Sequence, residues 1–411
     1  MYDEAYLDYY AAAARAAHEH GLWVIVDFHQ DAFSRFSIDG CGDGFPAWAV
    51  PSEVKLDPPD NGPACSNWGV KMQSDVDMMA SWQAFHAGES PGRAGYLAMV
   101  ARVSERLSGE PGVIGYDLLN EPWGDEVTEI GPLYEDAAAA IREASPEAIV
   151  FVSPQALTSA GTPTELLQPS FGNYVYSPHF YDASVVLFHA WSGFPPDDAF
   201  ATMTSVAEGW GVPLFLGEFG APGPSDDGDL YLDALYERLD LHLASGAQWV
   251  YTPGWTEAAK DGWNNEDFSI VDDTGAPRPT FRPRAYPAAV AGSPGRFHVT
   301  PAGAPGGPAI DLEWDHDPSK GITEIFVPRE AMFGAESVTV ETSGAGLECL
   351  WSGSRLLCGS PGAGPRTVRI RTGAAPSAES PACGLLGVEL VPLALLAASR
   401  RRRRRPRLTA G

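Results

Sequence analysis

The sequence predicts an α/β fold, a (β/α)8 TIM barrel that is followed by a small antiparallel β-sandwich. Three observations support this prediction. Short apolar segments alternate with helical patterns up to about residue 290, polar residues follow each apolar segment directly, and the pattern changes to short alternating segments between residues 296 and 372. Strands that alternate with helices are typical of parallel sheets, whereas closely spaced alternating segments are typical of antiparallel sheets.

Six segments up to residue 290 are apolar enough to be strands. They are Leu22–Phe28, Val113–Leu119, Ile149–Val152, Tyr174–Ser177, Val212–Gly217 and Gln248–Thr252. The helical patterns between them are Tyr6–His20, Gly95–Leu107, Leu133–Ala144, Phe200–Glu208 and Leu230–Ala244. A closed barrel of this type has eight strands, and a Pro-rich connection follows the last segment. We therefore interpret the six segments as strands three to eight and expect the first two strands to be missing from this sequence.

The chain is expected to contain three regions: an N-terminally incomplete barrel (1–290), a β-sandwich (296–372), and a linker with a tail (373–411). The tail holds Cys383, an apolar run from Gly384 to Ser399 and six arginines, Arg400–Arg405. It resembles the C-terminal sorting signals of some bacterial surface proteins, whereas the first twenty residues lack the basic and apolar regions of a signal peptide. We expect an extracellular or cell-surface bacterial protein whose signal peptide is missing here.

The composition is that of an acidic globular protein. Hydrophobic residues make up 44% of the chain and aromatic residues 11%, which excludes a disordered polypeptide. The 54 acidic residues outnumber the 27 basic ones, and the net charge is −27. Because such a chain is repelled by phosphate backbones, we expect no nucleic-acid partner.

The five cysteines predict disulfides rather than a metal or redox site. Cys41 and Cys65 bracket a Gly- and Pro-rich segment, Cys349 and Cys358 bracket a short hairpin, and no C-x-x-C motif occurs. Two local disulfides would place the protein in an oxidising compartment, although free thiols in a cytosolic protein are the alternative. No metal or cofactor is expected.

Two glutamates follow predicted strands in motifs that suit carboxylate chemistry. Glu121 lies in Asn120-Glu121-Pro122, and Glu218 lies in Gly217-Glu218-Phe219-Gly220. Either one alone would be read as a strand-end residue paired with a Lys or Arg. At the carboxyl ends of strands in one barrel, however, the two can face each other. Two carboxyl groups about 5 Å apart are what a retaining glycosidase needs, one as proton donor and one as nucleophile.

With these motifs the chain resembles glycoside hydrolase family 5, the cellulase superfamily. The resemblance implies that Glu121 is the acid/base, that Asn120 binds the sugar 2-hydroxyl and that Glu218 is the nucleophile. It further assigns His179-Phe180-Tyr181 to the family's His-x-Tyr motif, in which Tyr181 and His179 position the nucleophile. His29 matches the family's strand-three histidine, and Trp255 its strand-eight tryptophan. An indole at that position offers the sugar an apolar face.

A narrower resemblance is to the endoglycoceramidase branch, which releases intact oligosaccharides from glycosphingolipids. It rests on His29-Gln30-Asp31, on a long loop at residues 36–92, on DGWNNEDFSIVDD near 261–273 and on the C-terminal sandwich. Asp31 can accept hydrogen bonds from sugar hydroxyls, and the reaction needs no metal. The loop aromatics could form an apolar wall for lipid or pack the loop onto its own barrel; they are Phe45, Trp48, Trp68, Trp82 and Phe85.

The leading hypothesis is therefore a retaining endo-β-glycosidase that hydrolyses the oligosaccharide–ceramide linkage of glycosphingolipids. Its expected partners are a glycolipid or β-glycan substrate and a membrane or micelle surface. The alternatives are an endo-β-glucanase, an exo-β-glucosidase acting on glucosylceramide or steryl glucoside, and a non-catalytic glycan-binding surface protein. The sequence gives no indication of the oligomeric state.

Overall fold

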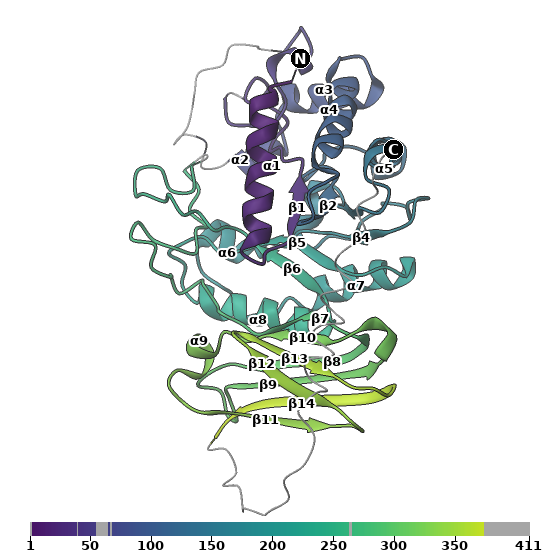
Figure 1. Ribbon diagram of the computed structural model, residues 1–411. Coiled ribbons are helices and arrows are strands. Elements are labelled where there is room, and N and C mark those ends of the chain that lie inside the picture. The colour runs from purple at the N-terminus through teal and green to yellow at the C-terminus, as the bar shows by residue number, and fades with distance from the viewer. Residues whose placement is uncertain (1, 39, 55–64, 66–67, 263–264, 374–411) are drawn as a thin grey trace, which may run out of the picture. The chain divides into compact units, whose positions relative to one another are not determined.

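The computed structural model describes residues 2–38, 40–54, 65, 68–262 and 265–373, and the predicted linker and tail lie beyond these ranges except for Gly373. The chain divides into two compact units, Met1–Arg282 and Pro283–Gly411 (Figure 1). No helix among the described residues combines the length and apolar character needed to cross a bilayer.

The first unit is built on six parallel strands that follow one another in chain order. Strands β1 to β4 form one sheet, β5 pairs with β6, and single bridges from Tyr176 to Leu214 and from His179 to Glu218 connect the two groups. The strands are β1 (Val24–Asp27), β2 (Val113–Asp117), β3 (Ile149–Val152), β4 (Tyr174–Tyr176), β5 (Phe215–Phe219) and β6 (Ser245–Gln248). Because the strands are parallel, their carboxyl ends lie on one side and can bring side chains together there.

Helices connect consecutive strands, as the alternating pattern predicts. The longer connecting helices are α4 (Gly92–Leu107), α5 (Gly131–Ala144), α7 (Asp197–Trp210) and α8 (Gly228–Leu241), and α1 (Glu4–Glu19) precedes β1. Asp3 caps α1 by accepting a hydrogen bond from the Tyr6 amide. The remaining helical segments of this unit are η1 (Ala47–Ala49), α2 (Trp68–Met72), α3 (Val76–Ala87), the π-helical η3 (Glu126–Ile130), η4 (Ala156–Ala160) and α6 (Ala183–Phe188).

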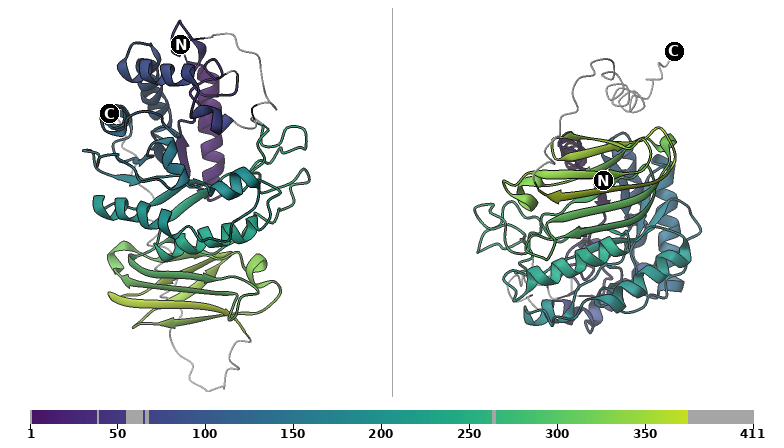
Figure 2. Two further views of the ribbon diagram at one scale, coloured as in Figure 1. Left: turned by 180° about the vertical axis from the view of Figure 1, so that it is seen from behind. Right: turned by 90° about the horizontal axis from the view of Figure 1, so that it is seen from below.

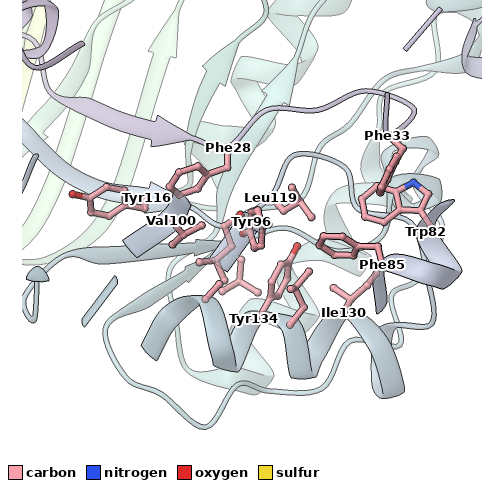
Figure 3. Close-up of a cluster of buried hydrophobic side chains, with 14 of the residues drawn as sticks. Phe28, Phe33, Trp82, Phe85, Tyr96, Val100, Tyr116, Leu119, Ile130 and Tyr134 are labelled. Atoms are coloured by element: carbon pink, nitrogen blue, oxygen red, sulfur yellow. Dashed lines mark hydrogen bonds between the residues drawn. The ribbon is translucent and has the colours of Figure 1, made fainter. Parts of the chain in front are cut away.

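Helix α3 corrects the prediction that residues 36–92 form one long loop. Asp75 caps this helix by accepting a hydrogen bond from the Met78 amide, and Gly88 ends it in the left-handed conformation. Its residues Trp82 and Phe85 are almost completely buried and pack against Phe33, with ring centroids 5.0 and 6.0 Å away (Figure 3). These two aromatics therefore belong to the core of the first unit and form no lipid-facing wall.

The second unit is the predicted antiparallel β-sandwich (Figure 2). One sheet has the strand order β12-β13-β10-β7 and the other β11-β14-β9-β8. The strands are β7 (Tyr286–Ala289), β8 (Gly292–Thr300), β9 (Ala309–His316), β10 (Thr323–Phe326), β11 (Val338–Ser343), β12 (Glu348–Ser352), β13 (Arg355–Gly359) and β14 (Gly364–Thr372), with short helices η5 (Pro318–Lys320) and α9 (Arg329–Phe333). Side chains from both sheets, such as Trp314 and Leu356, share one buried core. Residues 286–289, assigned to the barrel from sequence, pair here with β10.

Both predicted disulfides are present. Cys41 is bonded to Cys65 in the segment that follows β1, and Cys349 to Cys358 between the paired strands β12 and β13. Among the predicted strands, the sixth is misplaced. The sequence favoured Gln248–Thr252, whereas β6 spans Ser245–Gln248. Its Gly246 lies so close to Phe219 and Leu216 that a larger side chain would be crowded there.

Candidate active site

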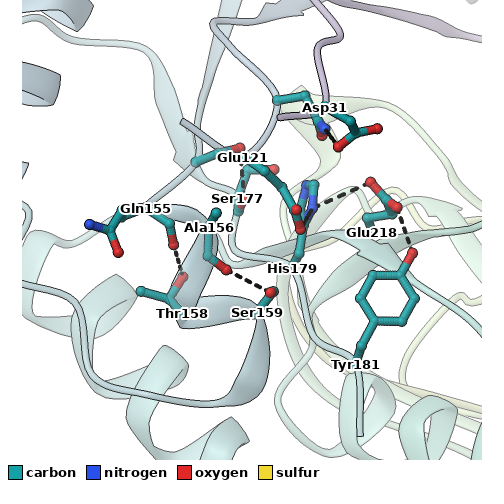
Figure 4. A network of polar contacts seen from close by, with 12 residues as sticks. Asp31, Glu121, Gln155, Ala156, Thr158, Ser159, Ser177, His179, Tyr181 and Glu218 are labelled. Atoms are coloured by element: carbon teal, nitrogen blue, oxygen red, sulfur yellow. Dashed lines mark hydrogen bonds and ion pairs between the residues drawn. The ribbon is translucent and has the colours of Figure 1, made fainter. Parts of the chain in front are cut away.

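Two glutamates and a histidine meet at the carboxyl ends of the parallel strands. Glu121 follows β2, Glu218 is the fourth residue of β5, and His179 follows β4. The Nδ1 atom of His179 lies 3.1 Å from Oε1 of Glu121 and 3.3 Å from Oε2 of Glu218 (Figure 4). Because both oxygens contact the same nitrogen, they lie no more than about 6.4 Å apart, a limit that includes the ~5–5.5 Å spacing of retaining glycosidases.

The electrostatics of this trio favour a charged imidazole between the carboxyl groups. Burial opposes ionisation of His179, but the charges of Glu218 and Glu121 outweigh it and raise the pKa of His179 to about 9. Burial also raises the pKa of Glu218, and the nearby Glu121 adds to this, whereas His179 opposes it. The charged histidine therefore favours the ionised form of Glu218 and counteracts the effect of its burial.

Tyr181 fixes the orientation of the Glu218 carboxyl group. Its hydroxyl donates a hydrogen bond of 2.5 Å to Oε1 of Glu218, so that the two oxygens of Glu218 have different partners (Figure 4). The Tyr181 ring packs edge-on against Phe268, with centroids 5.7 Å apart. Burial and the charge of Glu218 raise the pKa of Tyr181 well above its usual value, which keeps the hydroxyl proton available for donation.

A second group of polar residues follows β1. His29 Nδ1 lies 2.6 Å from Asp27 Oδ2, and His29 Nε2 lies 3.0 Å from Asp31 Oδ2. Burial disfavours the charged His29, but these two aspartates raise the pKa of His29 to about 12, so His29 donates from both ring nitrogens. Asn120 joins the group by donating a hydrogen bond of 3.3 Å to Asp31. Burial raises the pKa of Asp31, and Glu121 contributes in the same direction.

Gln30 positions the backbone that carries Glu121. Its side-chain amide donates to the carbonyl groups of Asn120 (2.7 Å) and Glu121 (3.0 Å), while its oxygen accepts from the Phe33 amide (2.7 Å). Gln30, Phe33 and Asn120 are buried, so these hydrogen bonds replace contacts with water that most of the groups could not make. Glu121 has a φ of +37°, a strained conformation for a residue with a side chain. The Gln30 hydrogen bonds thus hold a strained turn at a proposed functional carboxyl group.

Gly217, directly before Glu218, leaves room for His179. A Cβ atom at residue 217 would lie 3.1 Å from the His179 ring and 2.6 Å from the Ser177 hydroxyl. Any larger residue would therefore push the histidine away from the carboxyl pair. The close approach of Ser177 and His179 explains why a glycine occupies the first position of the Gly-Glu-Phe-Gly motif.

The indole beside the site is that of Trp249, and not that of Trp255 as the sequence predicted. Trp255 is buried, its indole N–H donates to Asp267 (2.9 Å), and the Arg278 guanidinium lies 4.2 Å from its ring centroid. A ring covered in this way offers no free face to a sugar. Trp249 directly follows β6 and stacks parallel to His29, with centroids 5.6 Å apart.

The loop aromatics have three different environments. Phe45 packs onto Phe33 with centroids 4.4 Å apart, whereas Trp48 is exposed. Trp68, at the start of α2, donates its indole N–H to Glu266 over 2.7 Å. Glu266 was not predicted as a site residue, and neither were Asp27, Gln30 and Trp249. In the described ranges, no group of three or more His, Cys, Asp or Glu side chains could hold a metal ion.

Comparisons with known proteins identify the family of this chain. The family model described as Cellulase (glycosyl hydrolase family 5) matches residues 1–256. Endoglycoceramidase I of Rhodococcus hoagii (strain 103S) is 26% identical, and the alignment covers 92% of this chain and 76% of that protein. An endoglycoceramidase of Hydra vulgaris is 23% identical over 48% of this chain and 41% of its own length.

Solved structures show the same fold. Endo-glycoceramidase II from Rhodococcus sp. in complex with ganglioside GM3 matches with a TM-score of 0.75 and 24% identity, over 91% of this chain and 86% of that one. Sterylglucosidase 1 of Cryptococcus neoformans matches with a TM-score of 0.67 and 16% identity, over 90% and 83% of the two chains. The predicted fold class, a barrel followed by a β-sandwich, is thereby confirmed.

Proposed function

The chain belongs to the cellulase family, glycosyl hydrolase family 5, and on this premise we propose that it is a retaining endo-β-glycosidase that cleaves glycosphingolipids between oligosaccharide and ceramide. One observation carries the proposal: His179 contacts both Glu121 and Glu218, and Tyr181 orients Glu218 alone. The two carboxyl groups are thus close enough for double displacement and sit in different surroundings, as two different roles require.

In the first step, Glu218 attacks the anomeric carbon while Glu121 gives its proton to the leaving oxygen. The bond from the sugar to the ceramide oxygen breaks, and a bond from the sugar to Glu218 forms. Tyr181 donates a hydrogen bond to one oxygen of Glu218, and His179, which is hydrogen-bonded to Glu121, lies 3.3 Å from the other; this orientation presents a lone pair to the sugar. Asn120 is held beside Asp31 and is the residue we assign to the sugar 2-hydroxyl.

In the second step, Glu121 accepts a proton from water, and the resulting hydroxide attacks the anomeric carbon. The bond to Glu218 breaks, and the sugar leaves with its original configuration after two inversions. His179 supports this change of role, because its protonated ring remains close to whichever carboxyl group is ionised at each stage. Trp249 and His29, stacked beside each other, form a wall for the sugar.

The glycolipid substrate is supported by two features. Two relatives are named endoglycoceramidase, and their alignments cover 92% and 48% of this chain. Beside the site, α6 begins two residues after Tyr181, and the side chains of Leu187 and Phe188 at its end and of Phe194 beyond it are strongly exposed. Exposed apolar side chains of this kind fit a lipid or micelle surface that presents the substrate.

The test is hydrolysis of lactosylceramide in detergent micelles, with the released sugar identified by mass. Intact lactose with ceramide is the expected product. Glu218→Gln should abolish release while near-ultraviolet circular dichroism stays unchanged, and retained turnover would overturn the nucleophile assignment. Monosaccharide as the first product would indicate an exo-β-glucosidase, and hydrolysis of β-glucan alone an endo-β-glucanase. Binding of sugar without any hydrolysis would indicate a glycan-binding protein.

We also propose that the protein works outside the cytosol. The two disulfides support this location, because such bonds persist in oxidising compartments. Fractionation of the source bacterium with an antibody to the sandwich unit tests it. Detection on the surface or in the medium is expected, and a cytosolic signal alone would contradict the proposal.

A further inference from the structure

Asp43 lies in a segment that pairs with the residues directly after β1. Asp31 and Asp43 form an isolated antiparallel bridge, in which the Asp43 amide donates a 2.9 Å hydrogen bond to the Asp31 carbonyl group. Two residues further along, the Phe45 amide donates to the Phe33 carbonyl group over 2.8 Å. Two backbone hydrogen bonds thus join this segment to the one that carries Asp31.

The side chain of Asp43 adds a third hydrogen bond to this pairing. Its Oδ1 atom accepts a 2.9 Å hydrogen bond from the Asp31 amide, so that one residue holds both the amide and the carbonyl group of Asp31. Asp43 is partly buried, and burial raises the pKa of its carboxyl group. A carboxyl oxygen accepts this hydrogen bond in the charged and in the neutral form.

The glycines on both sides of Asp43 permit this close approach. A Cβ atom at Gly42 would lie 2.7 Å from the Ser34 carbonyl oxygen, and one at Gly44 would lie 2.5 Å from the Cβ atom of Gln30. Gly44 also has a φ of +102°, which a residue with a side chain rarely adopts. The two glycines therefore let this short stretch of chain pack closely against the residues that follow β1.

Asp31 in turn holds two polar side chains of the site. One of its carboxyl oxygens lies 3.0 Å from Nε2 of His29, and the other accepts a 3.3 Å hydrogen bond from the side-chain amide of Asn120. Asn120 directly precedes Glu121 and is the residue assigned to the sugar 2-hydroxyl. Because the two carboxyl oxygens of Asp31 have different partners, a shift of the Asp31 backbone either moves Asn120 or breaks its hydrogen bond.

We propose that Asp43 is a positioning residue that, through Asp31, holds the Asn120 side chain in place for its contact with the sugar 2-hydroxyl. The inference rests on the proposed function, because it uses the role assigned to Asn120 there. Hydrogen bonds to the 2-hydroxyl strengthen in the transition state of glycoside hydrolysis. Loss of the Asp43 contact should therefore lower kcat more than it raises KM.

The experiment compares nitrophenyl β-lactoside with its analogue that lacks the 2-hydroxyl of the sugar at the cleaved bond. The readout is the ratio of kcat on the lactoside to kcat on the analogue. In Asp43→Ala this ratio should fall by about tenfold, the effect of one weakened hydrogen bond to the substrate, with little change in KM for the lactoside. Asp43→Asn should keep the wild-type ratio, because its carboxamide oxygen can accept from the Asp31 amide.

Asp75→Ala is the matched control. Asp75 accepts a 2.7 Å hydrogen bond from the Met78 amide at the start of α3, so this variant loses the same kind of contact outside the group of polar residues around His29. It should keep the wild-type ratio. Asp43→Glu retains the carboxyl group but displaces it by one methylene, and it should also lower the ratio. It replaces Asp43→Ala in the test if that variant loses the near-ultraviolet circular dichroism of the folded protein.

Three results would overturn the positioning role. Equal losses on both substrates in Asp43→Ala would mean that Asp43 only stabilises its own segment, an unchanged kcat would mean that it positions nothing, and an equal loss in Asp43→Asn would mean that the acceptor oxygen is irrelevant. Failure of the wild-type protein to cleave either substrate would contradict the proposed function instead. Calorimetry then compares the binding of glucose and 2-deoxyglucose to wild type and Asp43→Ala, and a preference for glucose that Asp43→Ala does not reduce would overturn the inference.

Discussion

Replacing Gln30 with Leu should show how much the hydrogen bonds that hold the Glu121 backbone contribute to activity, because the Glu121 carboxyl group itself stays unchanged. The change keeps the side-chain size but removes three hydrogen bonds to buried backbone groups, each contributing ~1 kcal/mol. Release of the strained φ of Glu121 returns part of this loss, about 1–3 kcal/mol. We therefore expect the free energy of unfolding to fall by only about 0–2 kcal/mol.

The loss of activity should be much larger than the loss of stability. Once the turn relaxes, the Glu121 carboxyl group moves away from His179, and a shift of ~1 Å costs about 100-fold in kcat. Urea unfolding and steady-state kinetics on nitrophenyl β-lactoside measure the two effects. Asn173→Leu is the matched control, because Asn173, like Gln30, donates its side-chain amide to two backbone carbonyl groups, but at the opposite end of β4. Similar kcat losses in both variants would refute the reasoning.

Three further predictions concern the site and its surroundings. Gly217→Ala should lower kcat by about tenfold with little change in KM, because the added methyl group forces the Ser177 hydroxyl and the His179 ring to shift slightly; a change in KM alone would contradict this. The pKa of His179 is raised to about 9, so its stabilising contribution is present below pH 6.5 and is lost as the pH rises through 9. The free energy of unfolding should fall by up to about 3 kcal/mol over this range, and His179→Gln should flatten the decrease. Replacing Phe188 and Phe194 with Ser should slow hydrolysis of micellar lactosylceramide by about tenfold and leave the soluble lactoside unaffected; equal losses would exclude a surface role.

Much of the fold could be predicted from local patterns, because strands and helices with clear periodicity depend on nearby residues. Ile149–Val152 was predicted with its observed bounds. The segment Ser245–Gln248 was missed, because it contains no β-branched residue and is a strand only through its pairing with β5. Helix α3 was assigned to a loop although Asp75 and Gly88 mark both of its ends.

The site residues likewise fall into two groups, those that a local motif predicts and those that only the tertiary structure brings together. Glu121, Glu218, His179 and Tyr181 lie in short motifs at strand ends, and the structure brings all four together. Trp249 was overlooked because the strand before it was placed three residues too late, which moved the expected indole to Trp255. The pairing of Trp68 with Glu266 spans 198 residues and depends on tertiary structure alone. No local pattern could have indicated it.

The Cys41–Cys65 disulfide has a consequence for the framework of the site. Cys41 is buried in the segment after β1, and Asp43 of the same segment accepts a hydrogen bond from the Asp31 amide. A disulfide with this loop length removes about 3 kcal/mol of chain entropy from the unfolded state. Thiol reductants should therefore lower the free energy of unfolding of the first unit and loosen the segment that holds Gln30 and Asp31, so that activity follows the redox state of the surroundings.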